Sequence, residues 1–414
     1  MLFIFNGGPG SSSVWLHLGM AGSRQVDFTD EVNPPTVPPF PLKDNPNALL
    51  DVADLVFVDP PGTGFSRVLP GGRTEDYYGT NQDALAVAKF IADWLSRNDR
   101  WASPKFVMGE SYGTTRAAAL ATTLMGGPTS ASGELGAITL NGILVLGPAM
   151  GGAVGDHLYG ANLPAMAATA WYHRPELRKG RTLDGAVEAA RTLAADSYMR
   201  ALYLGNALPA ADRQALAEQL AELTGLPAQT WLDNRLRLGL GAFSRELLRD
   251  RGLQVGAYDS RYVLPLKAAG ADPVADDPAM GQYTPAFVGA MNSYLNGELK
   301  VRMDAPYIPI AFSQVNSRWD YGPGGPRSRD AAAELAQALR RNPSLQLFVA
   351  AGHYDLVTTL GGAEYALNQV DLPQNRVTVK AYPSGHMPYL GAESARTLAA
   401  DVRAFILQAA QGSE

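Results

Sequence analysis

The sequence predicts an α/β fold: a mostly parallel central sheet, covered by helices on both faces, with a helical cap insertion. Two observations predict this class. Short apolar strand patterns alternate with helical patterns in both terminal regions of the chain, and such alternation is typical of parallel, doubly covered sheets. The long segment between these regions carries helical patterns and few strand patterns, which indicates a mainly helical insertion.

The strand and helix patterns can be placed along the chain one by one. The strand patterns are short apolar runs at residues 2–5, 54–59, 105–109, 138–148, 345–352 and 376–383. The helical patterns beside them cover residues 82–96, 114–125, 330–341, 359–369 and 393–409. Together they predict one sheet with helices packed on it.

The chain is expected to fold as a core interrupted by a cap. Residues 1–150 form the first part of the core and residues 306–414 the second part, whereas residues 151–305 form the cap. Helical patterns in the cap fall at residues 184–204, 210–224 and 243–251. An insertion of this size is expected to lie over the carboxyl edge of the sheet, where α/β proteins bind ligands.

Composition excludes several classes of function. The chain has 414 residues, of which 46% are hydrophobic, so it can build a packed core. A net charge of −6 without a basic cluster gives no nucleic-acid footprint. The chain has no cysteine, and its five scattered histidines form no HExxH pair, so we expect neither disulfides nor a metal site. The longest apolar stretch is too short to span a membrane, and the oligomeric state is left open.

A glycine-flanked serine follows the third strand pattern. Residues 109–113 read GESYG between a strand and a helix, which is the context of a nucleophile elbow. The glycines allow a turn tight enough to expose Ser111, and the helix behind it offers free amides. The alternative is a chance serine in a βα turn, but the strand–turn–helix context favours a nucleophile.

A serine nucleophile needs a base, and the base needs an orienting acid. Asp355 follows one late strand pattern and His386 follows the next. Both are therefore expected at the same sheet edge as Ser111, in the chain order Ser, Asp, His.

Other residues compete for these two roles. His353 is an alternative base, but it lies too near Asp355 in sequence to occupy the next loop. We expect it to shape the turn of the acid instead. Asp320 and Asp371 are weaker candidates for the acid because of their positions.

The glycine-rich stretch NGGPGSSS, residues 6–13, follows the first strand pattern. It is not a phosphate cradle, since the lysine of the Walker pattern is absent. Ser11, Ser12 and Ser13 are expected to be turn and helix-start residues. We interpret the loop as a source of backbone amides that face the carbonyl attacked by Ser111.

Five motifs together resemble the serine carboxypeptidases of the α/β-hydrolase clan. They are NGGPGSSS (6–13), VDPPGTGFS (58–66), GESYG (109–113), AGHYDLVT (351–358) and SGHMPYL (384–390). The stretch LLRDRGLQVGAYDSR, residues 247–261, is similar to bacterial members. The resemblance implies an α/β-hydrolase fold and a serine-type carboxypeptidase that forms an acyl-enzyme and needs no cofactor. Its partner would be a peptide substrate with a free C-terminus, with no nucleic acid and no membrane.

The resemblance also implies residue roles. The matched positions are Ser111, Asp355 and His386 for the catalytic triad, the amides of Gly8 and Tyr112 for the oxyanion hole, and Asn6, Gly7 and Glu110 for the substrate's C-terminal carboxylate. A Glu110 carboxyl beside a substrate carboxylate must share a proton with it, so the pKa of Glu110 is expected to rise. Peptide binding should then weaken as pH rises. A structural role for Glu110 is the alternative.

One position departs from the family pattern. Fungal and plant members carry a second glutamate 14 residues after the motif asparagine, and Met20 stands there in this chain. Two alternatives to a carboxypeptidase therefore stay open: an esterase or acyltransferase with the same triad, or an inactive α/β-hydrolase-fold binding protein. The residue preference around the cleaved bond is set by the cap and cannot be read from the sequence.

The start of the chain bears on localisation. Met1 leads directly into a core-strand pattern, and no signal peptide precedes it, so we expect an N-terminally short chain. By resemblance, the full-length parent would be periplasmic or secreted.

Overall fold

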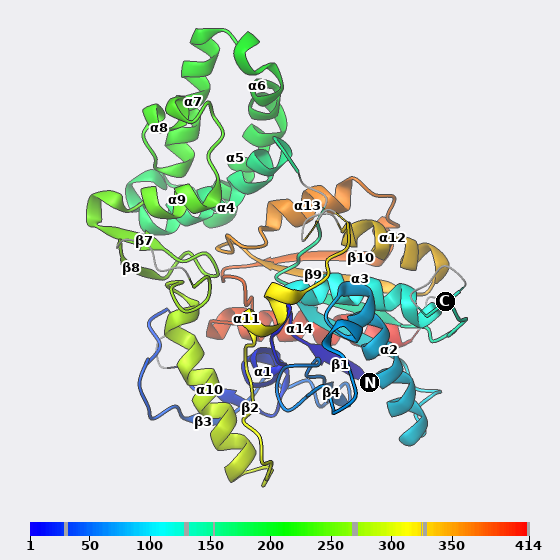
Figure 1. Cartoon of the computed structure of the whole chain (residues 1–414). Helices are drawn as coiled ribbons and strands as arrows, with labels where there is room; N and C mark the ends of the chain where they lie inside the picture. The colour runs from blue at the N-terminus through cyan, green and yellow to red at the C-terminus, as the bar shows by residue number, and fades with distance from the viewer. Residues whose placement is uncertain are drawn as a thin grey trace.

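A six-stranded sheet forms the centre of the molecule (Figure 1). The computed structural model describes residues 1–28, 32–127, 132–151, 154–266, 272–323, 325 and 329–411. All neighbouring strands of the sheet are parallel, in the order β10-β9-β6-β5-β1-β4. They are β1 (Leu2–Phe5), β4 (Leu55–Phe57), β5 (Phe106–Glu110), β6 (Gly142–Leu146), β9 (Gln346–Gly352) and β10 (Val377–Tyr382). Each falls at a predicted strand segment, which confirms the α/β class.

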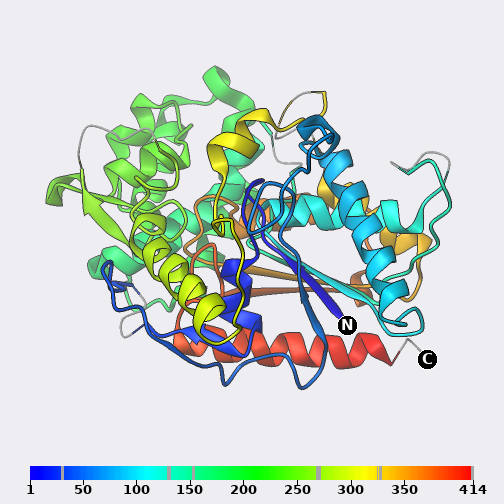
Figure 2. The same cartoon turned by 60° about the horizontal axis from the view of Figure 1, so that its bottom comes forward.

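The sheet strands point their side chains into two apolar cores, because successive residues of a strand face opposite sides. In β1, Leu2 and Ile4 pack on one side, and Phe3 and Phe5 pack on the other. The first side is covered by α1 (Val14–Leu16), α10 (Met280–Gly297) and α14 (Ala392–Ala410). The second side is covered by α2 (Thr80–Arg97), α3 (Tyr112–Met125), α12 (Ala331–Arg341) and α13 (Leu360–Asn368). Figure 2 shows α14, in red, on the face opposite α2 and α3.

Six helices form a separate lobe above the sheet (Figure 1). They are α4 (His157–His173), α5 (Leu183–Leu193), α6 (Met199–Leu204), α7 (Ala210–Thr224), α8 (Ala228–Asp233) and α9 (Leu240–Glu246). We call them the cap helices. They enclose their own apolar core, in which Trp231 and Phe243 are fully buried. Their stability therefore comes from packing within the lobe as well as against the sheet.

Two long helices, α4 and α10, were not identified from the sequence. Both contain a proline, Pro164 in α4 and Pro285 in α10, and proline inside a helix removes one backbone hydrogen bond. The burial of apolar side chains compensates for the lost hydrogen bond, since α4 contributes to the core of the cap helices and α10 packs against the first sheet face. The ring of Phe287 from α10 lies 4.9 Å from that of Trp15.

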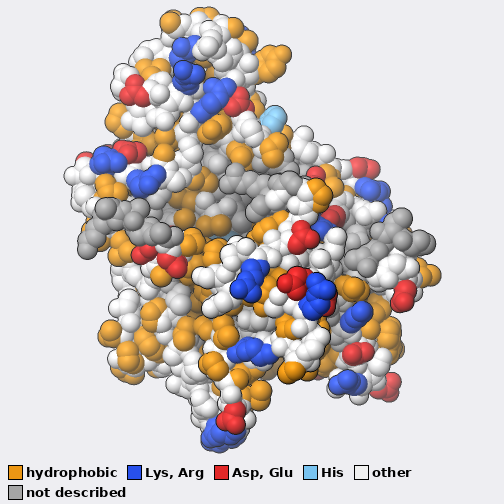
Figure 3. Space-filling model, in the orientation of Figure 1, with side chains coloured by type: hydrophobic (Ala, Val, Ile, Leu, Met, Phe, Trp, Pro, Cys, Tyr) orange, Lys and Arg blue, Asp and Glu red, His pale blue; other side chains and the backbone are white. Residues whose placement is uncertain are grey.

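Short elements complete the described part of the chain. Two antiparallel hairpins pair β2 (Arg24–Val26) with β3 (Leu42–Asp44), and β7 (Leu253–Val255) with β8 (Val263–Pro265). Helix α11 (Phe312–Val315) follows a loop that bonds to residues 10–12 and 64. On the face in Figure 3, acidic and basic side chains are interspersed. Within the described ranges, no helix combines the length and apolar character needed to cross a bilayer.

The sheet topology determines which loops can meet. In a parallel sheet, the loops that follow the strands all leave from one edge. The residues singled out in the sequence lie at the carboxyl ends of β1, β5, β9 and β10 or shortly after them, namely those at 6–8, 110–112, 355 and 386. They therefore converge at the edge beneath the cap helices.

Replacing Phe348 with alanine tests the packing of the first face. Phe348 of β9 is 1% exposed, and its ring lies 5.5 Å from that of Phe405 on α14. Phe348→Ala should lower the free energy of unfolding by about 3–5 kcal/mol, because it removes buried surface and leaves a cavity. Urea denaturation measures the change. The matched control is Leu69→Ala at a 74% exposed position, which should stay within about 0.5 kcal/mol of the parent. Equal losses in both variants would contradict this packing.

Candidate active site

Ser111 lies in the turn between β5 and α3. Its backbone has φ 61° and ψ −125°, a conformation that a residue with a side chain rarely adopts and that is typical of a nucleophile elbow. The turn leaves no room for a side chain at Gly109, where a Cβ would lie 2.2 Å from the Gly113 carbonyl oxygen. The local sequence GESYG therefore permits a turn that presents a half-buried serine at the sheet edge.

His386 and Asp355 form a buried hydrogen-bonded pair. His386 Nδ1 lies 2.7 Å from Asp355 Oδ2, and both side chains are almost completely buried. Asp355 is fixed by three more donors, the amides of Val357 and Thr358 at 2.7 and 3.0 Å and the Thr358 hydroxyl at 2.7 Å. This arrangement lets Asp355 hold one tautomer of the imidazole, with the proton on Nδ1.

The other imidazole nitrogen is free. His386 Nε2 is buried and makes no hydrogen bond to any residue in the described ranges. His386 and Ser111 border the same cavity. Burial alone lowers the pKa of His386, but the charge and hydrogen bond of Asp355, with the charge of Glu110, outweigh it and raise the pKa above its ordinary value.

The glycine-rich loop after β1 lies directly on the elbow. A Cβ at Gly7 would lie 2.5 Å from the Tyr112 amide nitrogen and 2.6 Å from the Glu110 carbonyl oxygen, so only glycine permits this approach. Gly8 has φ 103°, which also favours glycine. Tyr112 begins α3, and the first amides of a helix have no acceptor within it. Gly8, Ser111 and Tyr112 border one cavity.

A buried ion pair supports this loop from below. The Arg116 guanidinium of α3 donates to the Asn6 carbonyl oxygen at 2.5 Å and to Asp83 Oδ2 of α2 at 2.7 Å. Neither the Arg116 nor the Asp83 side chain has any exposed surface. The guanidinium also lies over the rings of Phe5 and Tyr112, 5.3 and 5.2 Å from their centroids. This pair was not predicted from the sequence, although an arginine beside three alanines in α3 was a signal.

Glu110 lies at the base of the same cavity. Its Oε1 accepts a hydrogen bond from Asn6 Nδ2 at 2.7 Å, and Asn6 Oδ1 accepts from the Leu16 amide at 3.2 Å. Burial raises the pKa of Glu110 to about 7, although His386, Tyr389 and Asn6 act to lower it. The raised pKa that the sequence led us to expect is therefore present before any substrate binds, and desolvation is its cause.

Two cavities meet at Ser111. The smaller, of about 60 Å³, is bordered by Asn6, Gly7, Glu110 and His386. Its remaining walls are largely apolar and come from Trp15, Val274, Met280, Ile310, Phe312 and Met387. The larger, of about 840 Å³, extends between the elbow and helix α4 of the cap. Gly8 and Ser111 border both, so the serine stands between a narrow apolar space and a wide cleft.

The loop between β7 and β8, residues 256–262, contacts the loops that carry Asp355 and His386. The Ala257 carbonyl accepts from the Leu356 amide at 2.9 Å, and the Tyr258 carbonyl accepts from the His386 amide at 2.6 Å. The Tyr258 ring stands edge-on to the His386 ring, with centroids 5.2 Å apart. Residues 247–261, which overlap this loop, resemble bacterial family members in sequence, but no role was predicted for them. It holds the loops of acid and base together.

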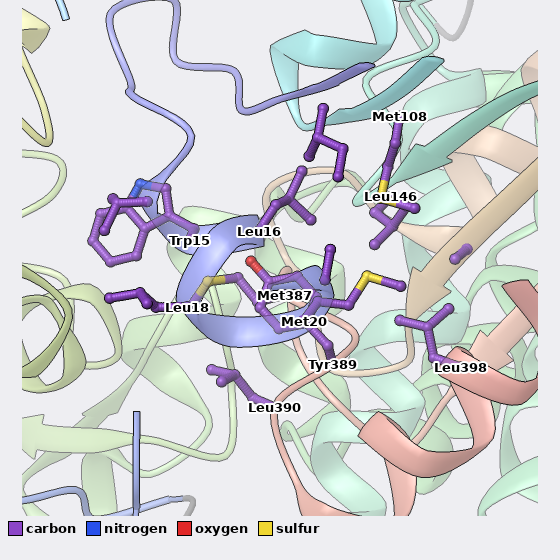
Figure 4. Close-up of a cluster of buried hydrophobic side chains, with 14 of the residues drawn as sticks. Trp15, Leu16, Leu18, Met20, Met108, Leu146, Met387, Tyr389, Leu390 and Leu398 are labelled. Carbon is purple, nitrogen blue, oxygen red and sulfur yellow. The ribbon is translucent and has the colours of Figure 1, made fainter. Parts of the chain in front are cut away.

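The competing residues lie elsewhere. The pKa of His353 is lowered by burial to about 4, and its Nε2 lies 3.6 Å from Asp184 of the cap helix α5. Asp320 and Asp371 are exposed and are not among the residues that border either cavity. Met20 is 3% exposed and lies in the apolar cluster with Leu16, Met387 and Tyr389 (Figure 4). It adds no charge to the site.

Comparison with known proteins supports the resemblance. Residues 1–180 match the family model described as serine carboxypeptidase, which covers the glycine-rich loop and the elbow. No curated protein sequence matches the chain. Among the described residues, no group of three or more histidine, aspartate or glutamate side chains could hold a metal ion.

A solved structure with a similar fold supports the architecture described above. A prohormone-processing carboxypeptidase from Saccharomyces cerevisiae is 14% identical, with a TM-score of 0.55 over 98% of this chain and 83% of that one. A proline iminopeptidase from Mycobacterium smegmatis is 14% identical, covering 99% and 90% of the two chains at a TM-score of 0.38. A malate-bound thermophilic esterase from Thermogutta terrifontis is 12% identical, covering 99% and 89% at 0.37. The chain has the α/β-hydrolase fold, and the family match supports a hydrolase.

Removing one partner of the buried ion pair should destabilise the protein. Asp83→Asn leaves the Arg116 charge buried without a counter-ion, which should cost about 3–5 kcal/mol of unfolding free energy. Urea denaturation measures the loss. Replacing both residues, as Asp83→Leu with Arg116→Met, should recover part of the lost unfolding free energy, because a buried apolar pair has no charge that needs a counter-ion. The control is Glu246→Gln, whose partner Arg249 is exposed. If Asp83→Asn lost no more unfolding free energy than this control, the supporting role of the buried pair would be contradicted.

Proposed function

We propose that this protein is a serine-type carboxypeptidase that removes the last residue of a peptide with a free C-terminus. The observation that carries the proposal is the position of Ser111 between the two cavities. On one side lies a small space that contains the buried Glu110 carboxyl and the Asn6 amide. On the other side lies a wide cleft beneath the cap. The small space would limit the leaving group to one residue, and the cleft would hold the rest of the peptide.

The reaction is an acyl transfer to water. His386 Nε2 takes the proton of Ser111, and the serine oxygen attacks the last peptide carbonyl. The amides of Gly8 and Tyr112 stabilise the oxyanion, and one such donor contributes roughly 3–4 kcal/mol. His386 then protonates the leaving amine, and water releases the acyl-enzyme by the same steps. Asp355 holds the imidazole and stabilises its charged form. No cofactor takes part.

Glu110 recognises the free carboxylate of the substrate. Two carboxyl groups in a dry site cannot both ionise, so they share one proton. Asn6 and the Gly7 amide supply the neighbouring donors. Because the pKa of Glu110 is about 7, the proton is present below that pH and is lost above it. Peptide binding therefore weakens as pH rises through about 7.

The buried Glu110 carboxyl separates this proposal from an esterase or acyltransferase. A neutral ester has no carboxylate with which the Glu110 carboxyl could share a proton, so this group would not strengthen its binding. Burying the Glu110 carboxyl nevertheless costs folding free energy. The second alternative, an inactive binding protein, has no need of the elbow strain at Ser111 or of the buried His386–Asp355 pair. Met20 leaves Glu110 and Asn6 to recognise the carboxylate.

Labelling with a fluorophosphonate tests the nucleophile. The parent should form one covalent adduct at Ser111, because His386 activates this hydroxyl and the oxyanion hole receives the phosphoryl oxygen. Intact-mass and peptide mass spectrometry locate the adduct. Ser111→Ala should abolish labelling, and the control Ser317→Ala should retain it. Folded parent protein that forms no adduct would exclude an active serine hydrolase.

Comparing an acid and an ester substrate tests carboxylate recognition. For an N-blocked dipeptide with an apolar last residue, kcat/KM should fall as pH rises through about 7. Glu110→Gln should remove this fall and lower kcat/KM at pH 6 by about tenfold or more, since a hydrogen bond to a charged group contributes about 1.5–3 kcal/mol. The ethyl ester of the same dipeptide is the control and should change little. Equal effects on acid and ester would contradict the carboxypeptidase.

A further inference from the structure

Two buried oxygen atoms behind the small cavity lack hydrogen bonds. Glu110 is 4% exposed and Tyr389 is 1% exposed. Neither Glu110 Oε2 nor the Tyr389 hydroxyl bonds to any residue in the described ranges. The hydroxyl nevertheless lies beside the Glu110 carboxyl, near enough to lower its pKa, although their present geometry falls short of a hydrogen bond. Leaving such groups unpaired usually costs about 1–3 kcal/mol each, so their juxtaposition calls for a function.

We propose that Tyr389 is a positioning residue for Glu110, whose hydroxyl donates to Oε2 when the carboxyl ionises. Asn6 already donates to Oε1 at 2.7 Å. When the Tyr389 hydroxyl donates to Oε2, each oxygen of the Glu110 carboxyl accepts one hydrogen bond. These two bonds fix the plane of the carboxyl. This inference deepens the proposed function and rests on it, because it assigns the pH range in which the free substrate carboxylate is accepted.

Packing keeps the Tyr389 ring in place. A Cβ at Gly19 would lie 2.5 Å from Tyr389 Cε2, so the ring rests against the backbone of the π-helix His17–Ala21. Figure 4 shows the ring in the apolar cluster with Met20 and Leu390. In a packed interior, such a ring has few alternative rotamers. Small movements of the hydroxyl and carboxyl are therefore enough to complete the bond, whereas the ring itself stays oriented.

Several groups influence the charge of Glu110. Burial raises its pKa, as does the charge of Asp355, whereas His386, Tyr389 and Asn6 act to lower it. Tyr389 in turn faces Glu110, Asn6 and Tyr283 of α10. A hydroxyl that donates to the ionised form favours that form. Tyr389 thus limits how far burial raises the pKa of Glu110, and it does so from the loop that also carries His386.

Removing only the hydroxyl tests this role. In Tyr389→Phe, Glu110 should keep its proton to a higher pH, so kcat/KM for the N-blocked dipeptide acid should fall about one pH unit later than in the parent. This shift is what loss of one hydrogen bond to a charged group supplies. Above pH 7 the variant should therefore have a higher kcat/KM than the parent, through a lower KM with kcat unchanged. The pH profile of kcat/KM for the ethyl ester should not move. Tyr198→Phe is the matched control, because its hydroxyl bonds the Leu236 carbonyl at 2.6 Å in the cap.

A second measurement does not depend on catalysis. The infrared C=O stretch of protonated Glu110, assigned by its loss in Glu110→Gln, can be followed against pH without substrate. Its midpoint should also move up by about one pH unit in Tyr389→Phe. Folding should be preserved, since the variant removes a hydroxyl that has no partner among the described residues.

The outcomes separate the two proposals. An unmoved infrared midpoint and an unmoved acid profile in Tyr389→Phe would overturn the role of Tyr389, while a specific effect of Glu110→Gln would leave the carboxypeptidase standing. An equal loss of kcat on acid and ester without a pH shift would show a merely structural tyrosine and also overturn it. Equal effects of Glu110→Gln on acid and ester would overturn both proposals, even if the infrared midpoint moved.

Discussion

The backbone of the Gly7 segment lies against the backbone of the nucleophile elbow, and the rest of the site depends on this approach. A single Cβ at Gly7 would overlap the Tyr112 amide. Because the two loops come from neighbouring parallel strands, β1 and β5, their ends meet at one sheet edge. The contact places Gly8 and Tyr112 at one cavity with Ser111, and Asn6 donates a hydrogen bond to Glu110. The two roles proposed for this site, oxyanion stabilisation and carboxylate recognition, would thus share one structural cause.

Buried polar groups hold this contact in place. The Arg116–Asp83 pair fixes the Asn6 carbonyl from below, and Asp355 fixes His386 from the opposite side. In a low-dielectric interior each such group is costly if left unpaired and strongly orienting if paired. Among the buried atoms without a hydrogen-bond partner in the described ranges, His386 Nε2 and Glu110 Oε2 belong to residues that border the small cavity. They are the atoms that a substrate would engage in the proposed reaction.

The segment between the two parts of the core does more than cover the site, because it also contacts the loops of Asp355 and His386. Loop residues 256–262 bond to the loops of both Asp355 and His386, so the geometry of acid and base depends on a segment that lies outside the core strands. Helix α4 borders the wide cleft beside Ser111. Changes in the cap therefore reach the reacting atoms through backbone hydrogen bonds as well as through the shape of the cleft.

The sequence by itself determined the strand and helix order and the loops in which Ser111, Asp355 and His386 lie, because apolar periodicity and turn residues are local signals. It did not identify helix α4 or α10, since Pro164 and Pro285 obscure the helical pattern and only burial offsets the lost hydrogen bonds. The side chains that contact the site residues could not be predicted from the sequence either. Arg116 meets Asn6 across 110 residues, and Tyr389 meets Glu110 across almost 280. Such contacts exist only after the chain has packed, so only the tertiary structure decided them.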